Sequence, residues 1–325
     1  MEGAEPIGLE DLAAASAGEL PSVDAVPSRI RADQFALAAI VTGALCIAFA
    51  PIFVRLSELQ PTATAFQRML LALPLFVLWD GLDASRRRRV DGTSRVRLDA
   101  RQRWMLVLAG LFFAADLAVW HWSIAYTSVA NSTLLANMAP LVVTVVAWLF
   151  FHERISRGFV AGLVLALAGA VLLVQAGSGS GAHHLLGDAL ALSTAFFYAG
   201  YLLTVKDLRR TVGTARLMVV SSAVSAACLL AVSLVQGESL WPSTARGWLV
   251  VLGLAWLAQV VGQGLIAFGM ARLPASFSSV SLLLQPPAAA VLAWLLLGES
   301  LSGWQLAGGA AVLAGIVWAR RASRT

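Results

Sequence analysis

The sequence predicts an all-α integral membrane protein with ten transmembrane helices, built as two inverted five-helix repeats with both termini in the cytoplasm. Composition, the lengths of the apolar runs and a similarity between the two halves lead to this prediction. The 325 residues are 59% hydrophobic and only 13% charged, whereas soluble globular domains contain about 25% charged residues. A chain this poor in charge could not cover a water-exposed surface, which excludes a soluble enzyme and a disordered or fibrous protein.

The apolar runs give the number of helices, because a helix needs about 20 apolar residues to cross a bilayer. Four long runs each have room for two crossings. Polar residues break them at 55–61, 126–128, 206–216 and 272–274. Two further runs, 158–174 and 303–318, are long enough for one crossing each. The sum is ten helices.

The domain organisation follows from the same runs. Residues 1–32 are rich in Glu, Asp, Ala, Ser and Pro and lack the basic segment and apolar core of a signal peptide, so we expect a disordered cytoplasmic tail. The remaining predicted units are a first repeat at 33–176, a periplasmic linker at 177–184, a second repeat at 185–320 and a cytoplasmic tail at 321–325.

Basic residues set the predicted orientation. The chain has 23 Lys and Arg residues against 18 Asp and Glu residues. With ten helices, Arg55 and Arg246 fall on the side opposite to the termini and Arg68 falls within a helix, while all the others share the side of the termini. The positive-inside rule therefore places both termini in the cytoplasm. The basic run at 86–89 is interpreted as an anchor at the lipid surface rather than a nucleic-acid site, and we expect a multi-pass protein of the bacterial inner membrane.

The two halves share a pattern at a fixed spacing. Residues 132–171 align with 278–317, which pairs Pro140 with Pro286 and Glu153 with Glu299. Because each repeat has five helices, the second must enter the membrane in the opposite orientation. Inverted repeats of this kind are typical of secondary transporters, whose substrate sites lie near the bilayer midplane between the repeats.

Several segments of the sequence also resemble a known family. The segments 65–75 (AFQRMLLALPL), 126–140 (YTSVANSTLLANMAP), 147–156 (AWLFFHERIS) and 286–302 resemble the EamA branch of the drug/metabolite transporter superfamily. The resemblance implies an exporter or permease of amino acids and other small metabolites. It also implies a pathway between the halves, with helices 1, 3, 4, 6, 8 and 9 around it and helices 5 and 10 outside.

Two charged residues lie inside predicted helices, where an ionised side chain is costly. Arg68 lies near the start of the second helix, and is either a structural cation held near residues 55–58 or a gate that binds a substrate carboxylate. Asp116 lies midway along the third helix and shares a face with Trp120, so it could line the pathway, carry protons or serve helix packing.

Polar and aromatic residues on the other helices complete the set of candidates. Amides, hydroxyls and indoles suit a zwitterion or a neutral amphipathic solute, although interhelical hydrogen bonds would explain many of them equally well. The candidate pathway residues are Asp116, Trp120, His121, Trp122, Asn137, Tyr198, Tyr201, Gln259, Gln263, Ser281 and Gln285.

Small residues recur every four positions in the fifth and tenth helices, and this predicts close helix packing, either within the fold or at a homodimer interface. Glu153 and Glu299 are predicted to cap the helix that follows each of them. Cys46 and Cys228 lie in apolar runs and are predicted to be reduced core residues.

The predicted function is export of small organic metabolites, foremost amino acids, by a secondary transporter whose partners are its substrate and the lipid bilayer. We expect no cofactor and no metal. We also expect no nucleotide, because the chain has no phosphate-binding loop motif. An importer of a vitamin or a nucleoside-like metabolite on the same fold is the alternative. An intramembrane enzyme would need a reactive cluster, and the sequence offers only Asp116 and His121, which face different directions.

Overall fold

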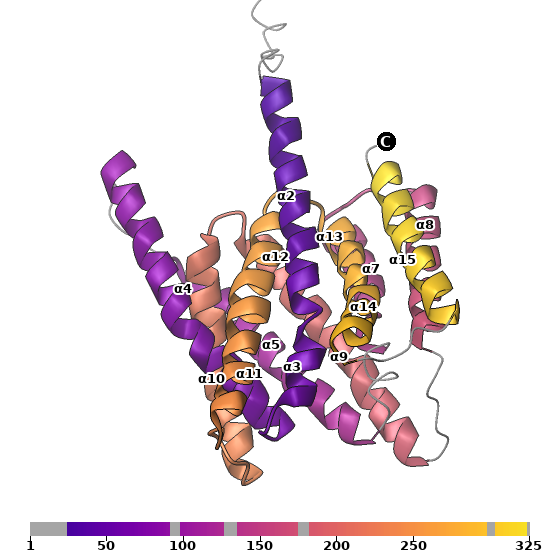
Figure 1. Ribbon diagram of the computed structural model, residues 1–325. Coiled ribbons are helices and arrows are strands. Elements are labelled where there is room, and N and C mark those ends of the chain that lie inside the picture. The colour runs from indigo at the N-terminus through magenta and orange to yellow at the C-terminus, as the bar shows by residue number, and fades with distance from the viewer. Residues whose placement is uncertain (1–24, 92–97, 127–134, 175–181, 298–302, 324–325) are drawn as a thin grey trace, which may run out of the picture.

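The protein is described here from a computed structural model, which describes residues 25–91, 98–126, 135–174, 182–297 and 303–323. In these ranges the chain is a bundle of helices without strands (Figure 1). The first half contains α2 (Ala25–Ile47), α3 (Ala50–Leu56), α4 (Pro61–Asp91), α5 (Ala100–Tyr126), α7 (Ala139–Phe150) and α8 (Arg157–Val174). The second half contains α9 (Ala182–Leu208), α10 (Thr214–Val235), α11 (Ala245–Gly253), a π-helix η2 (Leu254–Gln263), α12 (Gly264–Gly269), α13 (Ala275–Ser281), a 3₁₀ turn η3 (Leu282–Leu284), α14 (Gln285–Leu297) and α15 (Gly303–Ala322).

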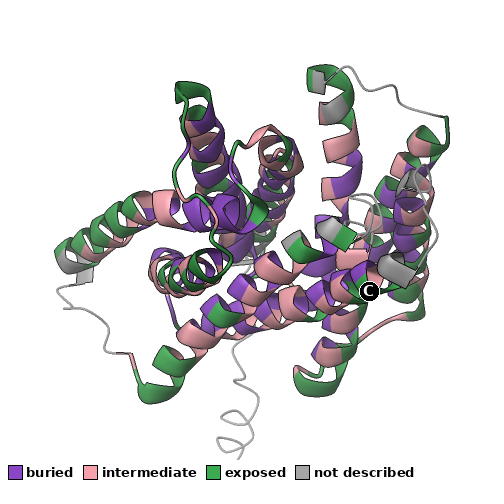
Figure 2. Cartoon of the chain, turned by 90° about the horizontal axis from the view of Figure 1, so that it is seen from below, coloured by how far each residue is buried: buried purple, intermediate pink, exposed green. Residues whose placement is uncertain are grey.

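The helices are long and apolar enough for a membrane. Seven helical segments of the described chain could span one by length and composition, and two shorter apolar helices cover Ala139–Phe150 and Arg157–Leu172. Large apolar side chains such as Phe150, Leu249 and Trp304 are about 70% exposed or more. Exposed residues follow the outward faces of the helices, and buried ones lie where helices meet (Figure 2). An apolar exterior of this extent marks contact with lipid.

Helix ends follow the predicted breaks, with two differences at the boundaries of the predicted domains. Helix α2 begins at Ala25, inside the segment predicted to be a disordered tail, because residues such as Ala and Arg favour continuation of the helix. Helix α9 begins at Ala182, so the end of the predicted linker is helical. The described ends of the chain, the start of α2 and the end of α15, lie at the same end of the bundle (Figure 1).

Prolines interrupt helices in the middle of the bundle. Pro51 follows the gap between α2 and α3, and it cannot donate a hydrogen bond to the carbonyl of Ile47. Pro286 and Pro287 follow η3, where the amide of Gln285 bonds the carbonyl of Leu282 in the tighter 3₁₀ pattern. Irregular backbone at membrane depth is tolerated where it is buried in protein or lines a cavity, so these interruptions point to a site between the helices.

Helices α8 and α15 pack against each other at one side of the bundle (Figure 1). A Cβ atom on Gly162 would lie 2.5 Å from the amide nitrogen of Ala319, and one on Gly315 would lie 2.5 Å from the amide nitrogen of Ala166. The small residues of the fifth and tenth helices therefore join the two halves within one chain. Gly308 is buried at the same contact, with its carbonyl oxygen 2.6 Å from the position of a Cβ on Gly169.

Candidate functional site

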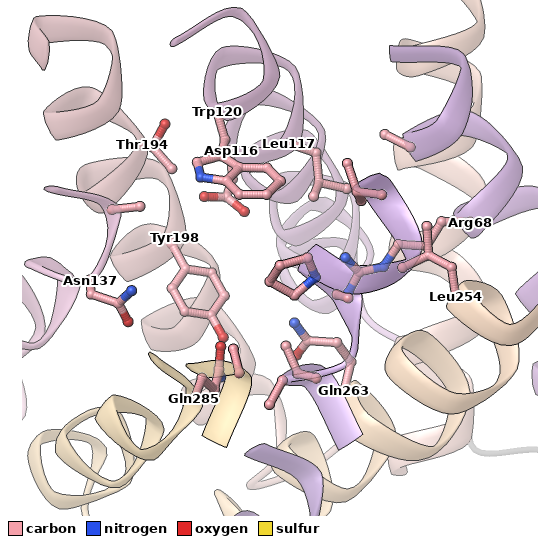
Figure 3. Close-up of a pocket in the computed structure, with 18 of the residues that line it drawn as sticks. Arg68, Asp116, Leu117, Trp120, Asn137, Thr194, Tyr198, Leu254, Gln263 and Gln285 are labelled. Atoms are coloured by element: carbon pink, nitrogen blue, oxygen red, sulfur yellow. The ribbon is translucent and has the colours of Figure 1, made fainter. Parts of the chain in front are cut away.

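A central cavity of about 150 Å³ lies between the two halves of the chain. Its polar lining comes from α4, α5 and the segment before α7 in the first half, and from α9, η2 and α14 in the second (Figure 3). The complete lining is Ile47, Ala48, Ala50, Pro51, Val54, Thr64, Ala65, Arg68, Phe113, Asp116, Leu117, Trp120, Ala136, Asn137, Thr194, Tyr198, Leu254, Gln263, Gln285, Pro286 and Ala289. All the helix interruptions described above contribute to it, since Ala48, Pro51 and Gln285 are among these residues.

Arg68 supplies the positive charge of the cavity. Its side chain is buried, with 7% of the residue exposed. The Nε group donates to Oε1 of Gln259 at 2.9 Å, and the guanidinium carbon lies 5.8 Å from the centre of the Phe113 ring. The prediction of a structural partner for Arg68 near residues 55–58 was therefore wrong, because its partner is the side-chain amide of Gln259 in η2 of the other half.

Asp116 supplies the negative charge. It lies on α5 with 8% of the residue exposed, and its carboxylate interacts electrostatically with Arg68. Trp120, one turn further along α5 on the same face, also lines the cavity (Figure 3). The shared face predicted for these two residues is therefore the face that lines the cavity.

Tyr198 and two glutamines form the part of the lining that comes from the second half. The Tyr198 hydroxyl points toward Gln285, and the amide of Gln263 lies nearby (Figure 3). Within the described chain, Nε2 of Gln285 and Oε1 of Gln263 have no hydrogen-bond partner. Tyr198, Gln285 and Asn137 also line a second cavity of about 20 Å³ that reaches Ser279 and Leu202. This part of the lining therefore separates the central cavity from a narrower continuation toward α13.

Comparison with known proteins identifies the family. Residues 34–175 and 185–321 each match the EamA-like transporter family. The chain belongs to this family. The resemblance drawn from the sequence is thus confirmed, and the two matched segments are the two halves that enclose the cavity.

Several relatives of this EamA protein are exporters by name. The pseudopaline exporter CntI of Pseudomonas aeruginosa is 26% identical over 209 residues, which cover 64% of this chain and 72% of the relative. A probable terminal-alkyne amino-acid exporter of Streptantibioticus cattleyicolor is 28% identical over 225 residues, covering 68% and 74% of the two chains. The threonine/homoserine exporter RhtA of Salmonella typhimurium is 28% identical over 224 residues, covering 68% and 72%.

A solved crystal structure shares the fold of this EamA protein. Its TM-score is 0.73 at 20% sequence identity, and the match covers 89% of this chain and 97% of the other. At this identity the comparison supports the helical architecture alone. The family and its named relatives together make this chain a multi-pass membrane transporter of small metabolites.

Not all predicted pathway residues reach the cavity of this EamA protein. Gln259 binds Arg68 instead of facing the cavity. Tyr201 is buried between aromatic neighbours, with its ring 4.5 Å from that of Phe113. The Ser281 hydroxyl donates to the carbonyl of Phe277 in its own helix.

Trp122 also lies away from the lining, with 45% of the residue exposed. His121 belongs to α5, but its side chain lies outside the described residues. The resemblance implied helices 1, 3, 4, 6, 8 and 9 around the pathway. The second helix, α4, lines the cavity as well.

Apart from aliphatic side chains and prolines, three lining residues were not predicted from the sequence: Thr64, Phe113 and Thr194. Thr64 lies four residues before Arg68, and Thr194 lies four residues before Tyr198. Residues four apart share a helix face. Extending each candidate by one helical turn would have found both threonines.

Glu153 contacts the other half of the protein. Its carboxylate accepts hydrogen bonds from the amides of Ala275 and Ser276, at 2.7 and 3.2 Å, and from the Ser276 hydroxyl at 2.5 Å. Glu153 therefore caps α13. The prediction that it caps the helix directly after it was wrong.

The backbone turns at His152, which has φ of 52°. A bond from the Glu153 amide to the carbonyl of Ala147 closes the end of α7. Glu299 lies outside the described residues.

Two other glutamates make similar contacts between the halves. Oε2 of Glu238 accepts from the amide of Ala63 at 2.5 Å, in the first turn of α4. Glu58 accepts from the amides and hydroxyls of Ser243 and Thr244, at the start of α11. Carboxylates at helix N-termini satisfy free amides and complement the helix dipole. The loops of each half are thus fixed to helix starts of the other.

We expect Glu58 to make a small pH-dependent contribution to stability. Hydrogen bonds from the Thr244 side chain and from Ser243 lower the pKa of its carboxyl. A lowered folded-state pKa gives stability that is present above the usual value, about 4.3, and is lost as the pH falls through the folded value. The unfolding midpoint in detergent should therefore fall less between pH 6 and pH 3.5 in Glu58→Gln than in the wild type. An equal fall in both proteins would contradict the assignment.

Proposed function

We propose that the protein is a secondary transporter that exports amino acids across the bacterial inner membrane. The observation that carries this proposal is the cavity with both charges, Arg68 and Asp116, enclosed by the two family-matched halves of an otherwise apolar bundle. Charged groups at membrane depth mark substrate or ion pathways. Two of the relatives described above are named as amino-acid exporters, which supports both the substrate class and the direction.

The proposed arrangement is ten helices in two inverted repeats with both termini in the cytoplasm. The distribution of Lys and Arg supports it, and so does the common position of the described chain ends at one end of the bundle (Figure 1). Inverted repeats enable alternating access, in which one repeat rocks against the other around a fixed site. In this mechanism, the contacts that Glu153 makes between the halves at one end of the bundle, and those of Glu58 and Glu238 at the other end, would break and form in turn.

Cysteine labelling tests the inverted topology. In a background with Cys46→Ala and Cys228→Ala, single cysteines at Arg154 and Ser300 should react with a membrane-impermeant maleimide from opposite sides. Arg154 should be labelled only in inside-out vesicles and Ser300 only in intact spheroplasts. Labelling of both positions from one side would overturn the inverted arrangement.

Amino-acid efflux from proteoliposomes tests the function. Vesicles loaded with an equimolar mixture of the twenty L-amino acids should release a subset of them faster with the protein than without it. Trp120→Ala and Gln285→Ala remove cavity walls and should lower that release by about tenfold or more, as expected when binding contacts of more than about 1.4 kcal/mol are lost. Trp104→Ala is the matched control, because Trp104 lies on α5 as well but is 62% exposed and away from the cavity.

Unchanged release in both cavity variants would show that the solute does not pass through this cavity. In intact cells, expression should raise the amino-acid content of the medium. Net accumulation inside the cells would favour an importer instead.

A further inference from the structure

The central cavity contains one positive and one negative side chain, and both are buried. Arg68 projects from α4 and Asp116 from α5, and each is more than nine-tenths buried. Both line the same space (Figure 3). An ionised side chain at membrane depth is retained only where it has a partner or a function.

These two charges do not close into an ion pair. Elsewhere in the described chain, Arg216 and Asp80 pair at 3.0 Å and Arg101 and Asp207 at 2.8 Å. Among the described residues, no atom of Asp116 lies within ion-pair or hydrogen-bond distance of Arg68 or of another donor. The two groups interact only at longer range. The buried carboxylate is therefore left without a direct partner, which is costly unless another group supplies one.

Arg68 is held so that part of its guanidinium stays available. Its hydrogen bond to Gln259 uses Nε, and the Phe113 ring lies beside the guanidinium carbon. In the described structure its two terminal NH₂ groups make no hydrogen bond. A guanidinium fixed in this way offers two parallel donors, the geometry that suits a carboxylate.

The surroundings of Asp116 suit a cation. Trp120 lines the same cavity one helical turn from Asp116 (Figure 3), and an ammonium group binds favourably near both a carboxylate and an indole face. Apolar residues such as Leu117 and Leu254 also line the cavity. The cavity is smaller than the roughly 300–1,000 Å³ of sites for drug-sized ligands, so it fits a small solute.

We propose that Arg68 and Asp116 recognise the opposite ends of a zwitterionic α-amino acid. The guanidinium of Arg68 binds the α-carboxylate, and the carboxylate of Asp116 with the indole of Trp120 binds the α-ammonium. The bound solute thereby supplies the partner that each buried charge lacks. This inference rests on the proposed function and adds to it the residues that determine specificity.

The test measures how two changes to the solute affect transport in the wild type and in variants of Arg68 and Asp116. From the amino-acid mixture described above, the fastest-released amino acid is chosen. Its α-hydroxy acid, which lacks the ammonium, and its α-amide, which lacks the carboxylate, then compete with it in counterflow. In the wild type, each analogue should compete about ten- to hundredfold less well than the amino acid, as expected for a lost hydrogen bond to a charged group.

The two variants should remove different parts of this preference. Asp116→Asn should abolish the discrimination against the hydroxy acid and keep that against the amide. Arg68→Gln should do the reverse, and Arg68→Lys, which keeps the charge, should restore part of the discrimination against the amide. Asp80→Asn and Arg216→Gln are matched controls, because they remove a closed Asp–Arg pair outside the cavity and should leave both preferences unchanged.

The outcomes separate the inference from the proposed function. Release of an amino acid with the same analogue preferences in Asp116→Asn, Arg68→Gln and the wild type would overturn the inference and leave the function standing. Release of none of the twenty amino acids would contradict the proposed function and the inference with it. Should Arg68→Gln fail to fold, as judged by size-exclusion chromatography, the Asp116→Asn result alone decides.

Discussion

The Glu153→Ala variant is expected to lose about 2–3 kcal/mol of stability, because charge-assisted hydrogen bonds contribute roughly 1.5–3 kcal/mol and lost helix caps cost about 0.5–2 kcal/mol. The substitution removes all the acceptors for the amides of Ala275 and Ser276 and for the Ser276 hydroxyl. Ala275 and Ser276 are buried, so water would replace these bonds poorly. The midpoint of SDS-induced unfolding in mixed micelles measures the loss.

Glu153→Gln separates charge from hydrogen bonding. The amide keeps one acceptor oxygen but carries no charge for the start of α13, so the variant should fall between the wild type and Glu153→Ala. Arg154→Ala is a suitable control, since Arg154 is exposed at the neighbouring position. Equal stability of Glu153→Ala and the wild type would show that the contact of Glu153 with α13 contributes nothing to the free energy of unfolding.

The Gly162→Ala variant is expected to be destabilised by about 1–3 kcal/mol, the usual cost of forcing additional atoms into a packed interface. The new methyl group would lie 2.5 Å from the Ala319 nitrogen and 2.7 Å from the Gly315 carbonyl oxygen. Both are backbone atoms, so relief requires α8 and α15 to move apart. The same SDS unfolding measurement detects the change.

Gly81→Ala is the control for Gly162→Ala, because it adds the same methyl group at a position where the helix has room for it. A Cβ atom at Gly81 meets nothing within 4 Å, and alanine in a helix is favoured over glycine by about 1 kcal/mol. Gly81→Ala should therefore be neutral or stabilising. A Gly162→Ala protein as stable as Gly81→Ala would exclude tight contact between α8 and α15.

The helix boundaries could be predicted from the sequence because each depends on local features. The break expected at 55–61 falls between the end of α3 at Leu56 and the start of α4 at Pro61. The small-residue stripes also predicted close packing of the fifth and tenth helices. The π-helix η2 has no comparable signal, since residues 254–263 have the composition of an ordinary apolar helix.

The site could be predicted only in part, because its contacts join distant segments. Asp116 and Trp120 were recognised from their spacing along one helix. The partner of Arg68, Gln259, is 191 positions away, and Glu153 binds a helix start 122 positions away. A helical period shows which residues share a face of one helix, and it does not show which helix that face meets.

The glycine contact between α8 and α15 has a consequence for motion. It joins the two halves where backbone approaches backbone, and neither helix lines the central cavity. At the glycine positions no side-chain rotamer can adjust to sliding of one helix along the other. Under the proposed alternating access, this edge of the molecule should act as the pivot of the motion, with the largest displacement at the distant helices α4 and α10.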